Sequence, residues 1–390
     1  MIHVTVVGAG AFGGWTALWL LRRGARVTLL DAWGPGNSRA SSGGETRVTR
    51  AVYGTDRVYI DWVARGLSLW RESEARWGQK LYRQTGALWM FGTDDDYARA
   101  SLPLIQDAGL SASELTVAEA RGRFPQIDFA GVRTAFWEEE AGYLLARRAC
   151  QAVVAGFVAE GGEYRQLAVA PPLFTGEALE HLELSDGSAL AADAYVFACG
   201  PWLGRLFPDV LGERAILPTR QEVFYFGTPP GDPRYLEGSC PIWIDIGDGS
   251  SFYGIPGNEN RGFKVADDTR GEPFDPTDGD RVPTPAFVER SRAWLAHRFP
   301  GMAGAPLLEA RVCQYENSPD GQLLFDRHPH AGNVWLLGGG SGHGFKLGPP
   351  LGQDVAGVIL GDLQAPEAFA LSRLRQVEDT PFKTQLLGRA

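Results

Sequence analysis

The chain has 390 residues, of which 44% are hydrophobic and 22% are charged, a composition typical of ordinary globular proteins. This length exceeds what one simple core needs and favours two interleaved or sequential domains. The formal net charge of −10 argues against nucleic acid and anionic membranes as partners, because their phosphates would be repelled. No apolar run approaches the length that crosses a bilayer, so we expect no membrane span.

Cysteine usage indicates the redox compartment. The four cysteines form neither a CxxC pair nor the spacing of a zinc site, and they are Cys150, Cys199, Cys240 and Cys313. This pattern favours a reduced, cytoplasmic protein without a disulfide framework or a metal centre. Residues 1–4 run straight into a strand pattern and lack a basic head with a cleavage site, which argues against secretion.

The first elements in chain order have the pattern of a βαβ unit. Residues 2–7 form an apolar, β-branched strand pattern, residues 11–23 a helix, and residues 27–31 a second strand. A glycine turn separates the first strand from the helix. Because parallel strands need a crossover connection, this order predicts two parallel strands joined by a helix.

The turn at residues 8–13 reads GAGAFG, a GxGxxG motif. Gly8 permits the tight turn, Gly10 lets the backbone approach a pyrophosphate, and Gly13 allows close packing of helix and strand. The helix N-terminus offers free N–H groups to phosphates, and Asp31 at the end of the second strand can accept ribose hydroxyls. The alternative is a glycine turn without a ligand. The motif alone does not distinguish NAD from FAD.

The rest of the chain alternates short strand and helix patterns and predicts a second domain. Residues 81–140 mix both patterns, while residues 215–270 are rich in aromatic, β-branched and turn residues, which favours an antiparallel sheet. The other predicted elements are helices at 56–77, 144–160, 285–298 and from 349, strands at 194–200 and 333–337, and a glycine cluster at 338–344.

Several later motifs occur together and in a definite order. The segment GGGSGHGFK at 338–346 resembles a flavin-binding signature of the monomeric sarcosine oxidase family, within the D-amino-acid-oxidase-like flavoproteins. The segment GETRVTR at 44–50, followed by a Tyr-Gly pair, resembles the GDTR segment of that family. The motifs FYG at 252–254, GFK at 262–264 and RVCQY at 311–315 follow in the family's order.

The resemblance implies an α/β fold in which a Rossmann-like FAD-binding domain is interleaved with an α+β substrate domain on a mixed or antiparallel sheet. We expect the FAD-binding domain to comprise residues 1–80, 141–214 and 305–390, and the substrate domain residues 81–140 and 215–304. The implied activity is oxidation of an amine C–N bond to an imine, with O2 reduced to hydrogen peroxide. The implied partners are a small amine or amino acid and O2, and the implied state is a monomer.

The resemblance also assigns residues beside the cofactor. Lys264 matches the lysine that promotes reaction with oxygen, and Arg47 lies beside the flavin ring. Cys313 matches the cysteine that holds FAD covalently through a thioether, although a buried structural cysteine remains the alternative. A solvated surface lysine is the alternative for Lys264. The residues expected to contact FAD are Gly8, Gly10, Phe12, Gly13, Asp31, Arg47, Cys313, Gly340, Gly342, Gly344 and Lys346.

The expected substrate site uses two cations. Arg50 and Lys346 match the pair that grips the substrate carboxylate, for which a planar fork and a point charge are suited; an internal salt bridge is the alternative. Tyr253 and Tyr315 match residues that line the active-site cavity, with core packing an equal possibility. His343 lies in the glycine cluster and is expected to position that loop near the flavin.

Two departures from the family pattern argue against sarcosine itself as the substrate. Ser42 and Gly43 stand where the family has two histidines, and Asp268 or a neighbour stands where it has a third. A smaller wall predicts a bulkier amino acid, and a carboxylate near the amine predicts a second cationic group on the substrate. Secondary amino acids, N-methyl or cyclic, and primary L- or D-amino acids are all compatible with the sequence. The alternatives in function are a flavin-dependent dehydrogenase with another electron acceptor and a non-catalytic dinucleotide-binding protein.

Overall fold

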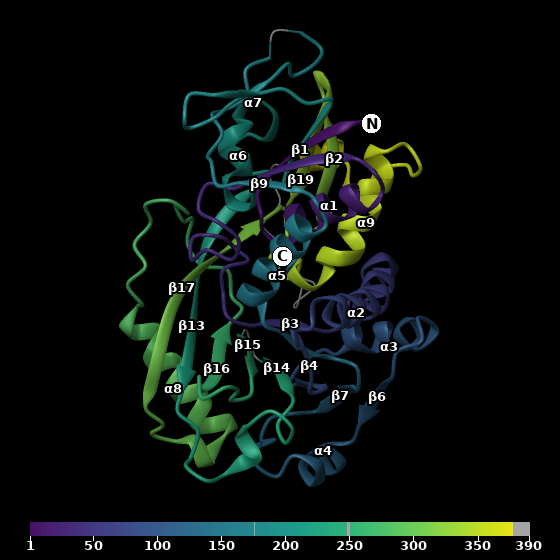
Figure 1. Cartoon of the computed structure of the whole chain (residues 1–390). Helices are drawn as coiled ribbons and strands as arrows, with labels where there is room; N and C mark the ends of the chain where they lie inside the picture. The colour runs from purple at the N-terminus through teal and green to yellow at the C-terminus, as the bar shows by residue number, and fades with distance from the viewer. Residues whose placement is uncertain (175, 248–249, 377–390) are drawn as a thin grey trace.

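The computed structural model describes residues 1–174, 176–247 and 250–376. Within them, two large β-sheets lie at opposite ends of the molecule (Figure 1). The strands of the first sheet are, in spatial order, β18 (Leu324–His328), β19 (Ala331–Gly338), β12 (Ala194–Phe197), β1 (His3–Val7), β2 (Arg26–Leu30) and β9 (Glu163–Arg165). All neighbouring pairs are parallel except β18 with β19. The predicted βαβ unit at the N-terminus is therefore confirmed.

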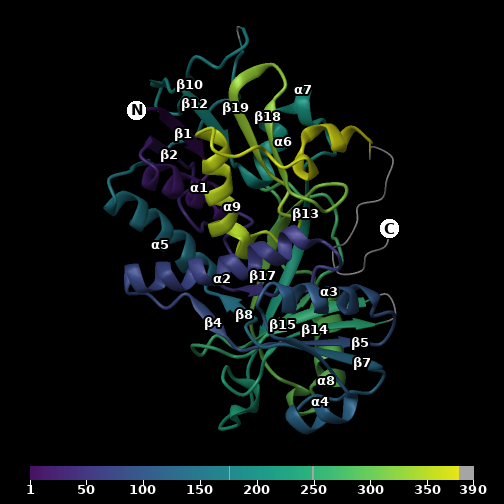
Figure 2. The same ribbon diagram turned by 90° about the vertical axis from the view of Figure 1, so that its right-hand side faces the viewer.

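Helices cover the first sheet because its strands are apolar on both faces. The helices α1 (Ala11–Arg22), α5 (Ala146–Ala159) and α9 (Gly348–Ile359) lie together beside β1 and β2 (Figure 2). Close approach of α1 and α9 depends on Gly352, where a Cβ atom would lie 2.6 Å from the backbone of Trp15. The backbones thus meet where a larger residue would separate them.

The second sheet is mostly antiparallel, and its one parallel pair is β14 with β5. Its strands are, in spatial order, β17 (Leu307–Asn317), β13 (Leu217–Phe226), β16 (Phe263–Asp267), β15 (Ser250–Ile255), β14 (Ile242–Gly247), β5 (Ala87–Phe91), β7 (Thr134–Glu138) and β6 (Ala112–Leu115). The antiparallel sheet predicted for residues 215–270 is confirmed. The boundary predicted at residue 305 remains a prediction, and β17 lies beyond it in this sheet.

Alternation along the second sheet separates a packed face from a face turned toward the first sheet. The helix α8 (Pro285–Arg298) covers the packed face, where the Trp294 ring stacks 4.4 Å from Trp243 and 5.0 Å from Phe252. Successive strand residues point to opposite faces, so Tyr253 and Lys264 point away from α8, toward the first sheet.

Smaller elements connect the two sheets. A three-stranded sheet joins β3 (Arg47–Thr49), β8 (Gly142–Leu144) and β4 (Tyr82–Gln84). The remaining α-helices and strands of the described residues are α2 (Arg57–Trp77), α3 (Asp96–Asp107), α4 (Val117–Arg123), α6 (Leu203–Leu206), α7 (Pro208–Leu211), and the pair β10 (Leu182–Glu183) and β11 (Ala189–Leu190). In the described part of the chain, none of the helices combines the length and apolarity that crossing a bilayer requires.

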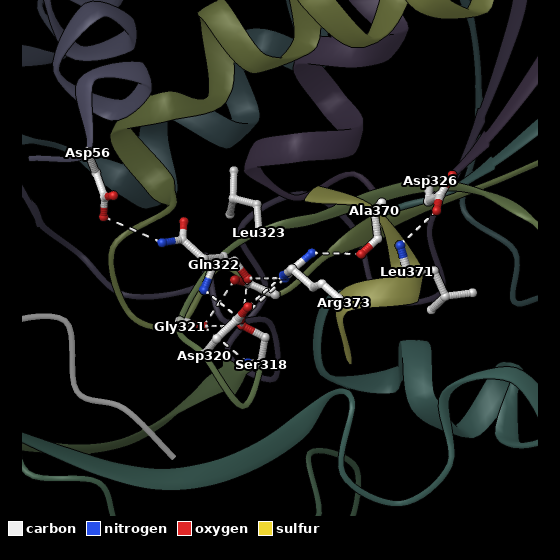
Figure 3. A network of polar contacts seen from close by, with 12 residues as sticks. Asp56, Ser318, Asp320, Gly321, Gln322, Leu323, Asp326, Ala370, Leu371 and Arg373 are labelled. Carbon is white, nitrogen blue, oxygen red and sulfur yellow. Dashed lines mark hydrogen bonds and ion pairs between the residues drawn. The ribbon is translucent and has the colours of Figure 1, made fainter. Parts of the chain in front are cut away.

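The turn at residues 318–322 is held against the segment that follows α9 (Figure 3). The Nε of Arg373 donates to the carboxylate of Asp320 at 2.6 Å, and an outer nitrogen of its guanidinium donates to the carbonyl of Gln322 at 3.1 Å. The backbone N–H of Leu371 donates to Asp326 at 2.7 Å. These contacts fix the position of a turn that reaches into the functional site.

Candidate cofactor cavity and adjoining active site

The GxGxxG segment folds into a turn that tolerates only glycine at two of its positions. Gly8 has φ 107°, and a Cβ atom there would lie 2.3 Å from the carbonyl oxygen of Ala198. At Gly13, a Cβ atom would lie 1.9 Å from the carbonyl oxygen of Gly8. The start of α1 is therefore packed directly against the ends of β1 and β12.

A cavity of about 250 Å³ opens at the carboxyl ends of β1, β2 and β12, the edge at which such sheets bind nucleotides. Residues from three distant parts of the chain line it, among them Gly8, Gly10, Phe12, Asp31, Arg47, Tyr315, Glu316, Gly340, Gly342 and Gly344. A Cβ atom at Gly344 would lie 2.5 Å from the Phe12 ring, and one at Gly340 would lie 3.5 Å from it. The N-terminal and C-terminal glycine segments thus meet at this ring.

The carboxylate of Asp31 holds the glycine turn in position. It accepts hydrogen bonds from the backbone N–H groups of Ala9 at 2.8 Å, Trp33 at 2.9 Å and Gly34 at 2.7 Å. Burial raises the pKa of Asp31, and these three N–H groups oppose the rise. Asp31 also lines the cavity, where its predicted contact with a ribose stays a prediction.

The residues of this cavity fit a dinucleotide. The first turn of α1 carries no acidic residue, and Gly10 provides no side-chain cap, so the positive end of the helix dipole favours a phosphate, although Ser42 already accepts from the Ala11 N–H. In addition, Oε2 of the buried Glu316 has no hydrogen-bond partner among the described residues. A buried polar atom without a partner is costly, and a bound group with a donor at this point would satisfy it.

A second, smaller cavity of about 60 Å³ adjoins the first. Arg47, Tyr315, Gly342 and Phe345 line both cavities, which therefore meet at these four residues. The smaller cavity is also lined by Arg50, Tyr253, Asp268, Arg270, His343 and Lys346. Six of the residues predicted for catalysis or substrate binding are brought together here: Arg47, Arg50, Tyr253, Tyr315, His343 and Lys346.

Arg50 and Lys346 are both buried beside the ring of Tyr53. The guanidinium of Arg50 lies 4.5 Å and the Nζ of Lys346 4.9 Å from the ring centroid. Arg50 donates to the carbonyl of Val52, and Lys346 donates to the carbonyl of His343 at 2.8 Å. Neither cation forms an ion pair with an acid in the described ranges, so the alternative of an internal salt bridge is not supported. Burial lowers the pKa of Lys346 well below its usual value, and the charge of Arg50 lowers it further.

Glu138 supports the segment that carries Arg50. Its buried carboxylate accepts from the backbone N–H of Ala51 at 2.5 Å and from Nε1 of Trp89 at 2.7 Å. Burial raises the pKa of Glu138, and the two hydrogen bonds and Arg50 oppose the rise. The sequence analysis did not identify Glu138, because it stands in a run of three glutamates, 88 positions from Arg50.

Next to the junction of the cavities, Arg47 is in contact with two further predicted residues, Lys264 and Cys313. The carbonyl of Thr46 accepts from Nζ of Lys264 at 3.2 Å and from the Arg47 guanidinium at 3.0 Å. The same guanidinium lies 3.3 Å from Sγ of Cys313. Burial lowers the pKa of Lys264 to about 7, and Arg47 contributes to this. Lys264 and Cys313 are not among the lining residues of either cavity.

His343 uses both ring nitrogens in contacts with the protein. The carbonyl of Gly321 can only accept, so Nε2 of His343 donates to it at 3.1 Å. Nδ1 is then unprotonated and accepts from the Tyr53 hydroxyl at 3.1 Å. Burial and the charge of Lys346 lower the pKa of His343 well below its usual value. The imidazole thus ties the glycine cluster to the turn that Arg373 holds.

Ser42 and Gly43 do not form a wall of the smaller cavity. Ser42 lines the larger cavity, where its Oγ accepts from the backbone N–H of Ala11 at 3.1 Å. A Cβ atom at Gly43 would lie 1.9 Å from the carbonyl oxygen of Asn37. The expectation that this pair makes room for a bulkier substrate is therefore wrong, because Gly43 faces backbone. Asp268, by contrast, does line the smaller cavity.

A nucleotide-type cavity that joins a small, cation-lined cavity defines the class of a dinucleotide-dependent oxidoreductase. The chain matches the family described as FAD dependent oxidoreductase over residues 3–357, and it belongs to that family. The cofactor of this family is FAD, and the residues of the larger cavity fit its dinucleotide part.

Individual relatives cover almost the whole chain. It is 27% identical to a monomeric sarcosine oxidase from Arthrobacter sp. (strain TE1826), covering 90% of this chain and 91% of that protein. It is 26% identical to an N-methyl-L-tryptophan oxidase from Yersinia pseudotuberculosis, covering 95% and 98%. Among solved structures, L-proline dehydrogenase from P. horikoshii has the same fold, with a TM-score of 0.84 at 19% identity, covering 96% and 98% of the two chains.

We expect Glu138→Ala to lower the free energy of unfolding by about 2–4 kcal/mol, because it leaves the Ala51 N–H and the Trp89 indole N–H buried without an acceptor. Glu138→Gln keeps one acceptor, and its loss should be about half as large. Urea denaturation of these variants measures the difference, with Glu139→Ala at the exposed neighbouring position as control. Equal losses in Glu138→Ala and Glu139→Ala would contradict this role.

Proposed function

We propose that this protein oxidises the C–N bond of a small amino acid, primary or secondary, and transfers the electrons to O2. The observation that carries the proposal is the pair Arg50 and Lys346, two buried cations without an ion-pair partner in the described residues, beside the junction with the FAD cavity. Such a pair suits a carboxylate. The relatives named above are an oxidase of sarcosine, an oxidase of N-methyl-L-tryptophan and a dehydrogenase of L-proline, which supports an amino acid as substrate.

The chain's own groups have distinct tasks in this reaction. FAD, when bound, supplies a two-electron acceptor. Arg50 and Lys346 bind the carboxylate and orient the substrate, while Tyr253 and Tyr315 restrict it from the sides. Orientation of this kind lowers the entropic part of the barrier. The amine must react as the free base, because a protonated nitrogen has no lone pair to supply.

The cofactor is held mainly by backbone. The glycine turn around Gly8, Gly10 and Gly13 would receive the pyrophosphate, and Asp31 the ribose. The loop with Gly340, Gly342 and Gly344 would lie along the remaining part of FAD, next to Phe12. Arg47, at the junction of the two cavities, would stabilise negative charge on the reduced ring. His343 would hold the loop in place through its two hydrogen bonds.

The proposal is tested by anaerobic absorbance titration of the yellow protein with N-methyl, cyclic, L- and D-amino acids. We expect small amino acids to bleach the flavin band, and admission of air to restore it. Arg50→Lys keeps the charge but loses the planar fork, so its apparent Kd for the substrate should rise about tenfold or more. If no amino acid bleaches flavin-containing protein, the assignment of Arg50 and Lys346 is wrong.

Oxygen as the acceptor rests on Lys264. A fixed positive charge next to the flavin would stabilise superoxide as it forms. The alternative is a dehydrogenase with a different acceptor, which the likeness to L-proline dehydrogenase keeps in view. A non-catalytic dinucleotide-binding protein is not favoured, since it would not need unpaired buried cations.

The charge of Lys264 gives this proposal a pH dependence. Its pKa is lowered to about 7, so the ammonium is present below that pH and is lost as the pH rises through it. We expect the rate constant for flavin reoxidation by O2 to fall as pH rises from 6 to 8, measured by stopped flow. Lys264→Met should be slow at every pH, whereas Lys264→Arg should keep a rate that does not change with pH. Wild-type reoxidation that equals that of Lys264→Met would favour the dehydrogenase.

We also propose that Cys313 carries FAD covalently. Its Sγ lies 3.3 Å from the guanidinium of Arg47, which lines both cavities, so this thiol would lie near the flavin and could hold it as a thioether. Acid-precipitated wild-type protein should retain yellow, fluorescent flavin on a denaturing gel, and Cys313→Ala should lose it. Cys199→Ala removes a thiol that lines the larger cavity and is the matched control. Complete release of flavin from the wild type would rule out the linkage.

A monomeric state and a cytoplasmic location complete the proposal. The monomer is supported by the family resemblance. The location is supported by the cysteines, since Cys150, Cys199, Cys240 and Cys313 are all unpaired, as is usual in reducing compartments.

A further inference from the structure

Asp268 is the one carboxylate among the described residues that line the smaller cavity. It follows β16, and its backbone N–H donates to the carbonyl of Ser251 at 2.7 Å, which fixes its position. Oδ1 accepts from the Tyr315 hydroxyl at 2.7 Å. The carboxylate makes no ion pair within the described ranges, although its neighbour Asp267 pairs with Arg290 at 3.0 Å. Oδ2 is therefore left for a group inside the cavity.

The groups around Asp268 are mostly basic, so this carboxylate is the group suited to a positively charged part of the substrate. The ionisable groups that line the cavity with it are Arg47, Arg50, Tyr253, Arg270, Tyr315, His343 and Lys346. Four of these are basic side chains that suit an anion, the two tyrosine hydroxyls are neutral, and both nitrogens of His343 are engaged. Asp268 is thus the one anionic acceptor that the described residues of this cavity offer to the positive end of a zwitterion.

The position of Asp268 decides which positive group of the substrate reaches it. The Tyr315 hydroxyl donates to Asp268 at 2.7 Å, and Tyr315 lines both cavities, so Asp268 lies next to their junction. A substrate whose carboxylate lies on Arg50 and Lys346 would turn the carbon that is oxidised, and the nitrogen on it, toward that junction. The amine on the α-carbon, or its N-substituted form, is the group that lies within reach of Oδ2. This geometry favours the reacting amine over the second cationic group expected from the sequence.

We propose that Asp268 binds the ammonium group of the incoming zwitterionic amino acid and takes one proton from it. The inference rests on the proposed function. One N–H bond breaks and its electron pair stays on nitrogen, while an O–H bond forms at Oδ2 of Asp268; no electrons are transferred in this step. The product is the free amine that oxidation requires, next to a neutral carboxylic acid. The Tyr315 hydroxyl occupies Oδ1 throughout.

The surroundings of Asp268 are compatible with this proton transfer. Burial raises the pKa of Asp268, while the charges of Arg270 and Arg50 and the hydrogen bond from Tyr315 oppose the rise. Once the substrate carboxylate covers Arg50 and Lys346, one of the opposing charges is neutralised. Substrate binding itself therefore makes Asp268 a stronger base.

The test compares Asp268→Asn with the wild type. The probe is an N-methyl or cyclic amino acid that bleaches the wild-type flavin, and the readout is the anaerobic rate of flavin reduction from pH 6 to 10. In Asp268→Asn only substrate that is already deprotonated can react. Its reduction rate at low substrate concentration should rise about tenfold per pH unit toward the pKa of the substrate amine. The wild-type profile should be flatter, and the two should differ by about 10- to 100-fold at pH 7.

Two controls isolate the role of the carboxylate. Asp267→Asn removes the neighbouring charge and should keep the wild-type profile. Asp268→Glu restores a base and should recover part of the rate at pH 7. An Asp268→Asn profile parallel to that of the wild type would overturn the proposal, and so would an equal loss in Asp267→Asn.

A binding measurement separates this inference from the proposed function. N,N-dimethylglycine carries a carboxylate and an ammonium group, whereas (methylthio)acetate carries the carboxylate alone. Titration of the flavin spectrum with each ligand gives two Kd values. We expect Asp268→Asn to weaken N,N-dimethylglycine about tenfold or more and to leave (methylthio)acetate unchanged. Equal effects on both ligands would overturn the role of Asp268 even where the protein oxidises amino acids; failure to oxidise any amino acid would overturn the proposed function instead.

Discussion

Arg50 and Lys346 are buried beside one tyrosine ring, and no carboxylate of the described residues forms an ion pair with either; the smaller cavity is arranged around this desolvation. Removing a cation from water costs several kcal/mol unless partners replace the lost hydration. Arg50 and Lys346 receive partial compensation from the Tyr53 ring and from backbone carbonyls. The remaining imbalance is the physical basis for the proposed binding of a carboxylate in this cavity. Glu138 accepts a hydrogen bond from the backbone N–H of Ala51, and this contact holds the neighbouring Arg50 in position.

The second sheet positions polar side chains near the smaller cavity because its two faces have different partners. Phe252 packs on the aromatic residues of α8, and the next residue, Tyr253, lines the smaller cavity. In the same way Phe263 lies 6.0 Å from Trp243, while Lys264 reaches the carbonyl of Thr46. Each of the two strands, β15 and β16, therefore carries a hydrophobic residue that packs on one face and a polar residue on the other. The position of the polar group is set by packing on the opposite face.

The sequence was sufficient where local chemistry decides the structure. The strand, glycine turn and helix around Gly8 and Gly13 follow from steric constraints of a few neighbouring residues, and they were predicted correctly. Arg50 and Lys346 are 296 positions apart. That they meet in the fold was predicted from the family resemblance, because no periodicity in the sequence links them. Glu138 escaped prediction because its partners become neighbours only in the folded chain. The surroundings of Gly43 could not be predicted, since the absence of a side chain in the sequence says nothing about which atoms fill its space; here they are the backbone of Asn37.

The order of strands in the first sheet also bears on how the protein is made. β1 pairs with β12, and β12 pairs with β19, so residues 3–7 reach their final environment only after residue 338 has been synthesised. Contacts of such long range slow folding and leave hydrophobic strands uncovered in the meantime. During synthesis, the sheet around the N-terminal strand is therefore completed only when nearly the whole chain has left the ribosome. The edge at which the larger cavity opens also includes Gly340, Gly342 and Gly344, so its lining is complete only when nearly the whole chain has been made.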